Sequence, residues 1–367
     1  MSIIIFIIIL LVLVIVHEFG HFFTAKIFGI RVDEFGFGFP PKLFGYKKGE
    51  TEYSLNLFPI GGFVKIFGEN PNEENINGPD SQRSFVNKAK YKQAIVLFAG
   101  VLMNFLLAWL LFSFGFASGL PTSVGSQPAG YILEDVNLTV ISVLAESPAD
   151  LAGLRSGDKI IYIGSGSDVA EDLTLESVRS FIISHPGQEL EIGYTRGQAT
   201  SDLIFINVTP VISSWSETPT IGIAMDQVGI AKLPILTALS EGMKLNWALT
   251  KRTATGLYTL IGEAITGKGS FESIAGPVGM VAIVDDAYEF GFVYLLSFTA
   301  LISINLAIIN LLPFPALDGG RLLFLLIEKI KGSPIRPKVA NTANLIGFVV
   351  LMLLIVFVTY HDVVKLL

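Results

Sequence analysis

The chain has 367 residues, of which 51% are hydrophobic and 16% charged, and its mean hydropathy is +0.61. This balance is not typical of a soluble globular protein and indicates a membrane protein. The net charge of −7 provides no broad basic surface, which argues against a nucleic-acid partner. Because cysteine is absent, disulfides are excluded, and a metal site must use His, Asp or Glu.

The apolar residues gather into four runs that are long enough to cross a bilayer, which takes about 20 residues. The first run covers 2–28 and lacks the basic start and small-residue cleavage site of a signal peptide, so it is interpreted as a span. The other runs lie at 94–120, 292–314 and 345–360. Four spans place both termini on the same side of the membrane.

Basic residues predict the orientation, because Lys and Arg accumulate in cytoplasmic loops. The segments 28–93 and 321–344 are rich in Lys and Arg and are therefore expected in the cytoplasm. The segment 121–233 is dominated by acidic residues and is expected on the opposite side.

The first cytoplasmic segment contains a predicted β-hairpin. Apolar and polar residues alternate over 52–57, and a turn signal precedes them at 47–50. The apolar, Gly-rich stretches 35–39 and 58–67 suggest partial insertion beside the membrane helices. The polar run 69–83 is interpreted as a linker without chemistry.

A small β-rich domain is predicted over 122–226, with strands separated by Gly, Pro and Ser turns and a helix at 174–184. Its expected strands are 139–143, 159–163, 189–194 and 203–208. The following run, 234–266, carries charges at intervals and is predicted to be an amphipathic helix at the membrane interface.

The first span ends in the sequence His17-Glu18-Phe19-Gly20-His21, an H-E-x-x-H motif. Positions four apart share one helix face, so both imidazoles can ligate one metal while Glu18 lies beside it as a base. Ionisable residues at the end of an aliphatic span are costly in lipid and are functional by default. The alternative to a metal site is a structural pair of histidines whose hydrogen bonds are satisfied within the protein core.

A catalytic zinc usually has three protein ligands, so another His, Asp or Glu must come from elsewhere in the chain. Asp318 is the acid at the end of the third span, where Pro313 and Pro315 break the helix and Gly319-Gly320 permits a close backbone approach. An ordinary helix-ending turn with a solvated aspartate is the alternative. The remaining histidines, His185 and His361, are expected to be structural or solvated.

Three motifs in order along the chain resemble the site-2 proteases, specifically the regulator of sigma-E protease branch. These motifs are HEFGH in the first span, Gly100-Val101-Leu102-Met103-Asn104 in the second, and Asn305 followed by NLLPFPALDGGR in the third. The similarity also includes NLFPIGGFVKI in the hairpin and Gly276-Pro277-Val278-Gly279 before the third span. It runs over nearly the whole chain.

The resemblance implies a zinc metalloendopeptidase that cleaves within transmembrane segments. It implies that His17, His21 and Asp318 bind Zn²⁺, that Glu18 is the general base, and that substrate is held by Asn305, Pro313 and Pro315. It also implies that the hairpin pairs with unwound substrate as an added strand, which is consistent with the need to replace the hydrogen bonds a helix gives up.

The segment from Thr139 to Asp158 resembles a PDZ domain of the permuted bacterial kind. The chain carries one such domain, whereas some relatives carry two in tandem. Such a domain would act outside the membrane as a size filter or as a ligand reader, and the sequence leaves both open.

The fold class expected is a polytopic α-helical membrane protein with about four transmembrane helices, a membrane-associated β-hairpin region and an inserted PDZ-like α+β domain. Its expected parts are the first transmembrane helix with HExxH (1–30), the hairpin region and linker (31–92), the second transmembrane helix (93–120), the extracytoplasmic PDZ domain (121–228), the amphipathic region (229–291), the third transmembrane helix with the LDGG motif (292–320), a cytoplasmic loop (321–343) and the fourth transmembrane helix (344–367).

The expected location is the bacterial cytoplasmic membrane, with the active site toward the cytoplasm. The expected partners are the lipid bilayer and single-span membrane proteins that another protease has already shortened. A catalytically silent PDZ scaffold is the alternative, although such a protein would be free to lose Glu18 or Asp318. A metal transporter is disfavoured, because only one span is clearly broken.

Overall fold

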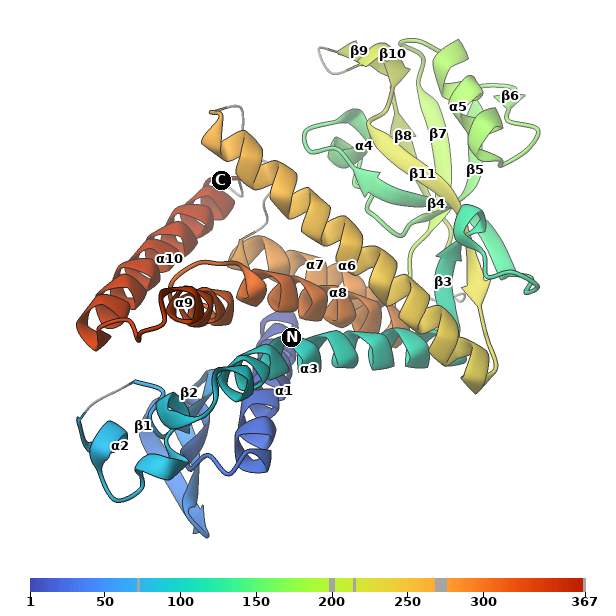
Figure 1. Ribbon diagram of the computed structural model, residues 1–367. Coiled ribbons are helices and arrows are strands. Elements are labelled where there is room, and N and C mark those ends of the chain that lie inside the picture. Colours follow the sequence, from blue (N-terminus) through green and yellow to red (C-terminus); the bar gives the residue numbers. More distant parts are fainter. Residues whose placement is uncertain (71–72, 198–201, 214–215, 268–275, 366–367) are drawn as a thin grey trace. The chain divides into compact units, whose positions relative to one another are not determined.

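The computed structural model describes residues 1–70, 73–197, 202–213, 216–267 and 276–365 (Figure 1). The chain divides into two compact units. One comprises Met1–Leu111, Met243–Asp285 and Phe298–Leu367, and the other comprises Phe112–Gly242 and Asp286–Ser297. Part of the predicted amphipathic region, 268–275, lies outside the described residues.

Among the described residues, four helices are long and apolar enough to cross a membrane, as predicted. They are α1 (Ser2–Ile27), α3 (Lys90–Ser118), α8 (Phe292–Leu311) and α10 (Pro337–Lys365). The predicted amphipathic run forms α6 (Ile235–Ile265), which is not among these candidate spans. A further helix, α7 (Pro277–Glu289), precedes α8.

The third predicted transmembrane segment, 292–320, is not one continuous helix. Helix α8 ends at Leu311, before the two prolines that cannot continue it, and α9 (Asp318–Lys331) begins after a short loop. Helix α9 therefore occupies much of the region expected as a cytoplasmic loop, 321–343. Helix α10 starts earlier than the predicted fourth transmembrane helix, 344–367.

The predicted hairpin is present and is longer than the alternating run indicated. Strands β1 (Val32–Lys48) and β2 (Thr51–Ile66) pair antiparallel, and the turn lies at Gly49-Glu50. The Gly-rich stretches 35–39 and 58–67, expected to insert partially beside the membrane helices, lie almost entirely within these strands. Irregular pairing along β1 and β2 accommodates their prolines and glycines.

The base of the hairpin is anchored in a buried apolar cluster shared with α1 and α3. Val32 and Ile66 pair with each other there, and the cluster also contains Ala25, Ile30, Phe85, Val96 and Leu97. Toward the turn, large apolar side chains are exposed instead. The predicted linker contains a short helix, α2 (Glu73–Asn77), and the 3₁₀ turns η1 (Ser81–Arg83) and η2 (Phe85–Asn87).

The second unit contains an antiparallel sheet. Its strand order is β3-β11-β4-β5-β7-β8, and β6 pairs with β5. The strands are β3 (Leu120–Ser123), β4 (Glu134–Val143), β5 (Lys159–Ser165), β6 (Asp168–Val169), β7 (Leu190–Thr195), β8 (Ile204–Val208) and β11 (Ile223–Ala231). A separate pair is formed by β9 (Val211–Ser213) and β10 (Ser216–Thr220). The remaining elements are η3 (Val124–Ser126) and α4 (Pro148–Leu151).

The predicted helix of this domain is α5 (Leu175–Ser184), which begins where the Thr174 side chain accepts a hydrogen bond from the Ser177 amide. Its apolar residues Val178, Phe181 and Ile182 follow helical spacing and are buried in the core of the sheet. The β-rich domain therefore has its own core.

Candidate metal centre

Helix α1 positions the two histidines of the motif. His17 and His21 are four residues apart on one helix face, and each is 6% exposed. Their Nε2 atoms lie 3.2 Å apart. The spacing and the helix are thus sufficient to bring two metal-ligating atoms together.

The break after α8 brings Asp318 to these histidines. Asp318 is the first residue of α9, and its Oδ2 lies 3.0 Å from His17 Nε2 and 3.2 Å from His21 Nε2. A Cβ on Gly319 would lie 2.2 Å from the Leu311 carbonyl oxygen. Only a residue without a Cβ permits this approach, so Gly319 helps to place Asp318.

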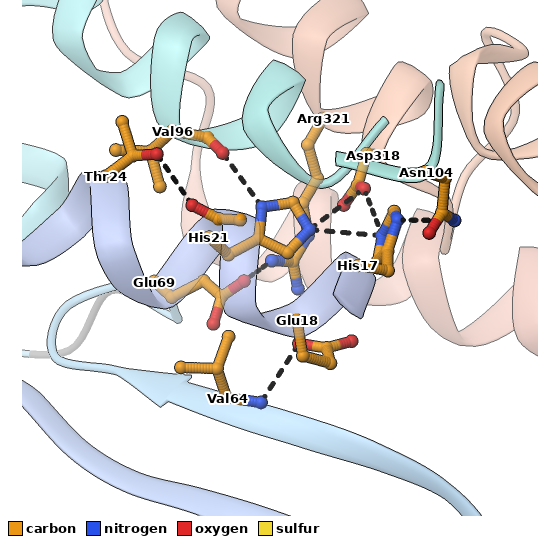
Figure 2. Close-up of polar contacts among 11 residues, drawn as sticks. His17, Glu18, His21, Thr24, Val64, Glu69, Val96, Asn104, Asp318 and Arg321 are labelled. Carbon is orange, nitrogen blue, oxygen red and sulfur yellow. Dashed lines mark hydrogen bonds and ion pairs between the residues drawn. The ribbon is translucent and has the colours of Figure 1, made fainter. Parts of the chain in front are cut away.

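The spacing of His17 Nε2, His21 Nε2 and Asp318 Oδ2 fits the ligand positions of a zinc ion. In a tetrahedral site with Zn–N distances near 2.0 Å, neighbouring ligand atoms are about 3.3 Å apart. The three separations, 3.0, 3.2 and 3.2 Å, are close to this value (Figure 2). His17, His21 and Asp318 can therefore hold one zinc ion.

Helix α3 leaves room for the imidazoles because it has glycine at position 100. A Cβ there would lie 2.4 Å from His21 Nε2 and 2.8 Å from His17 Cε1. Gly100 therefore preserves the space that the two metal-ligating rings occupy.

Backbone and side-chain contacts fix the rings and the carboxylate. His21 Nδ1 lies 2.8 Å from the Val96 carbonyl oxygen, and His17 Nδ1 lies 3.4 Å from Asn104 Nδ2. Asp318 lies outside the four candidate spans. Burial tends to raise the pKa of Asp318, but hydrogen bonds from His17 and His21 outweigh it and lower that pKa. The carboxylate is thus in its ligating, ionised form at neutral pH.

Glu18 lies next to the ligands on the same turn of α1. Its Oε2 accepts a hydrogen bond of 3.1 Å from the backbone amide of Val64 in β2 (Figure 2). This contact connects the candidate base to the hairpin. Nearby, Arg321 of α9 forms an ion pair with Glu69, so the segment predicted to be a linker without chemistry contributes a charge beside the site.

The three residues expected to bind substrate lie in two different settings. Asn305 is an exposed residue of α8 and lines a cavity of about 780 Å³. Pro313 and Pro315 lie in the loop between α8 and α9. Neither His185 nor His361 belongs to the ligand cluster found among the described residues.

Comparison with known proteins identifies the family. The sequence pattern described as peptidase family M50 matches residues 5–354. The chain belongs to peptidase family M50. This family comprises the site-2 proteases, so the resemblance seen in the motifs is confirmed.

The similar proteins include three that are named zinc metalloprotease RasP. The one from Oceanobacillus iheyensis is 31% identical, with 100% of this chain and 99% of that protein covered. Those from Shouchella clausii and Geobacillus kaustophilus are 30% and 31% identical, covering 98% and 99% of this chain and 98% of each relative. This chain is accordingly a zinc metalloprotease of the membrane, and its metal is zinc.

The alignment with the Oceanobacillus protein extends over 448 residues and is longer than this chain. That relative therefore carries residues that have no counterpart here.

Several residues around the site were not assigned roles from the sequence. Gly100 and Asn104 belong to a quoted motif, but their effect on the histidines depends on how α3 faces α1. Val64 and Arg321 act through tertiary contacts that no local spacing indicates. The short interval between Asp318 and Arg321, about one helical turn, is the only sequence signal that could have linked that arginine to the site.

Proposed function

We propose that this chain is an intramembrane endopeptidase that hydrolyses peptide bonds within the transmembrane segments of single-span membrane proteins. His17, His21 and Asp318 hold the zinc, and Glu18 is the general base. The observation that carries the proposal is the tetrahedral spacing of three ligand atoms, two of them on α1, a helix apolar enough to span a membrane, and the third on Asp318.

Zinc, when bound, supplies a Lewis acid and makes water a stronger acid. Glu18 accepts a proton from that water and later returns it to the leaving amine. Its position is set by the helix that carries the ligands and by the Val64 amide, which holds one carboxylate oxygen. The two imidazoles and Asp318 hold the metal without themselves transferring protons.

The hairpin offers an edge for an unwound substrate segment. Because the Val64 amide donates to Glu18, it points away from β1 and toward α1 at this position. A substrate strand that pairs with this edge of β2 would form new backbone hydrogen bonds in place of those it had as a helix. Its carbonyl group would then lie beside Glu18. The exposed apolar side chains toward the hairpin turn, among them Phe44, support contact with the bilayer.

The substrate helix approaches through the apolar cavity that Asn305 lines. Residues of α1, α8 and α10 form this cavity, together with Gly276 and Pro277 before α8. Its volume of about 780 Å³ and largely apolar walls suit part of a transmembrane helix. Asn305 supplies an amide among apolar walls, where an unwinding backbone needs hydrogen-bond partners. Pro313 and Pro315 hold substrate nearer to the metal ligands, on the loop that precedes Asp318.

The distribution of basic residues supports an orientation with the metal ligands toward the cytoplasm of a bacterial cell. The β-rich domain, 121–228, is a PDZ domain on the other side of the membrane. It excludes substrates whose extracytoplasmic parts have not been shortened. The products are released cytoplasmic fragments, such as an anti-sigma factor domain, or cleared signal-peptide remnants.

The test is co-expression with a tagged transmembrane substrate, comparing the intact enzyme with Glu18→Gln. The variant should keep zinc and accumulate uncut substrate, with a rate about 10²–10⁴-fold lower, since a general base contributes about this much. Glu263→Gln provides the control, because Glu263 is an exposed residue of α6. Undiminished cleavage by Glu18→Gln would refute the mechanism and favour a silent scaffold.

A further inference from the structure

Each metal-ligating imidazole must present the lone pair of Nε2 to the metal. A neutral imidazole carries one proton, so that proton must lie on Nδ1 and needs an acceptor when the ring is buried. Metal-ligating histidines in general donate this N–H to a carbonyl, carboxylate or water. The partners of the two Nδ1 atoms therefore determine whether both rings are ready to ligate.

For His21 the partner settles the tautomer. Its Nδ1 lies 2.8 Å from the Val96 carbonyl oxygen, and a carbonyl can only accept. Nδ1 therefore carries a proton, and Nε2, which faces Asp318 and His17, is the atom that ligates when zinc is bound.

For His17 the partner can either donate or accept a hydrogen bond. Its Nδ1 faces the carboxamide of Asn104, which offers both a donor nitrogen and an acceptor oxygen. In the orientation observed, Nδ2 lies 3.4 Å from Nδ1, while Nε2 lies 3.0 Å from the Asp318 carboxylate. With Nδ2 toward the ring, the carboxamide offers no acceptor to a proton on His17 Nδ1.

The Asn104 oxygen is meanwhile without a hydrogen-bond donor among the described residues, although the side chain is completely buried. Its backbone is held by the Ser303 hydroxyl, which donates to the Asn104 carbonyl over 2.8 Å. Half a turn of the carboxamide about its last side-chain bond exchanges oxygen and nitrogen without moving the backbone. Oδ1 then meets Nδ1 and gains the donor that it lacks.

We infer that Asn104 is a positioning residue whose carboxamide oxygen accepts a hydrogen bond from His17 Nδ1–H, and so selects the tautomer of His17 that can ligate zinc. The inference rests on the proposed zinc ligands. A side chain without an acceptor would leave the metal-bound His17 with a buried, unpaired N–H.

The test measures zinc affinity of the purified full-length protein by competition with a chelator of known affinity. Asn104→Leu and Asn104→Ala should bind zinc about 10–100-fold more weakly, which is the range found when such partners of metal ligands are removed. Asn104→Asp keeps an acceptor oxygen at the same place and should restore affinity to within a few-fold of the unmodified protein. A cobalt-loaded sample reports the ligand geometry by its visible spectrum, which should shift only in the acceptor-free variants.

Asn246→Leu is the matched control. Asn246 is also completely buried, its carboxamide oxygen also has no partner among the described residues, and its Nδ2 donates to the carbonyl of Phe105, the neighbour of Asn104 on α3. It should bind zinc normally.

Three outcomes would overturn the inference: unchanged affinity in Asn104→Leu and Asn104→Ala, equal weakening in Asn246→Leu, or an Asn104→Asp protein as weak as Asn104→Leu. If the unmodified protein bound no zinc through His17, His21 and Asp318, the proposed function would fail instead.

Discussion

Replacing Gly100 with alanine should weaken zinc binding strongly while leaving the protein folded. The new Cβ would lie 2.4 Å from His21 Nε2 and 2.8 Å from His17 Cε1. Ordinary contact begins near 3.4 Å, so the His21 ring must retreat by about 1 Å. Metal–ligand distances tolerate only about 0.2 Å, so both rings would leave their ligating positions.

The expected size of the effect follows from this displacement. Misplacement of a functional group by about 1 Å costs on the order of 100-fold, which corresponds to roughly 3 kcal/mol of zinc binding. Folding should survive, because the atoms met are parts of side chains and alanine is a better helix former than glycine by about 1 kcal/mol. Loss of zinc should therefore occur without loss of helicity.

The assay is metal analysis of detergent-purified protein, with circular dichroism and gel filtration to establish that the chain is folded. Gly256→Ala is the control, since a Cβ at that position of α6 meets no atom within 4 Å. One zinc per chain is expected in the control and in the unmodified protein. A Gly100→Ala protein that kept full zinc and full cleavage would show that the space around the imidazoles does not limit metal binding.

Three further predictions concern other parts of the chain. Gly319→Ala should lower zinc content strongly, because its Cβ would meet a backbone carbonyl and displace Asp318; retention of metal in this variant would contradict the placement. Arg196→Ala should destabilise the β-rich domain by about 3–5 kcal/mol, since it leaves the fully buried Asp158 without its charged partner, and thermal unfolding or protease resistance would detect this. Deleting 121–228 should leave zinc in place and permit cleavage of a substrate with a bulky extracytoplasmic part; a folded deletion protein that cut neither the long nor the short form would refute the filter.

Local patterns in the sequence were sufficient for the parts of the fold that depend on neighbours along the chain. The four apolar runs correspond to helices of spanning length, and His17 and His21 meet because four residues make about one helical turn. The hairpin turn lies where its polar, Gly-containing signal is found. In each case the interaction that decides the structure is close in sequence.

Two elements, helix α9 and strand β11, were not predicted from the sequence. Helix α9 lies largely in a segment that was expected as a cytoplasmic loop from its basic residues, yet its apolar side chains follow helical spacing and its Gly332 ends it in the left-handed conformation. Strand β11 was not predicted, since Ile223–Ala231 contains a glycine and an aspartate, and it is stabilised by pairing with β3 and β4, which lie far away in the sequence. Intrinsic strand propensity predicts a strand poorly where pairing with distant strands decides the structure.

The proposed metal ligands depend on both kinds of interaction, because His17 and His21 are close in sequence while Asp318 is distant, and small residues bring their helices together. A Cβ on Gly20 would lie 2.4 Å from the Ala99 carbonyl oxygen, so α1 and α3 approach closely at the turn that carries His21. Gly100 keeps the space beside the rings open, and Gly319 lets α9 begin against the end of α8. The H-E-x-x-H spacing thus supplies the donor atoms, while glycines on three different helices determine whether those atoms meet. A chain with the same motif and larger residues at these positions would keep its ligands and lose the site.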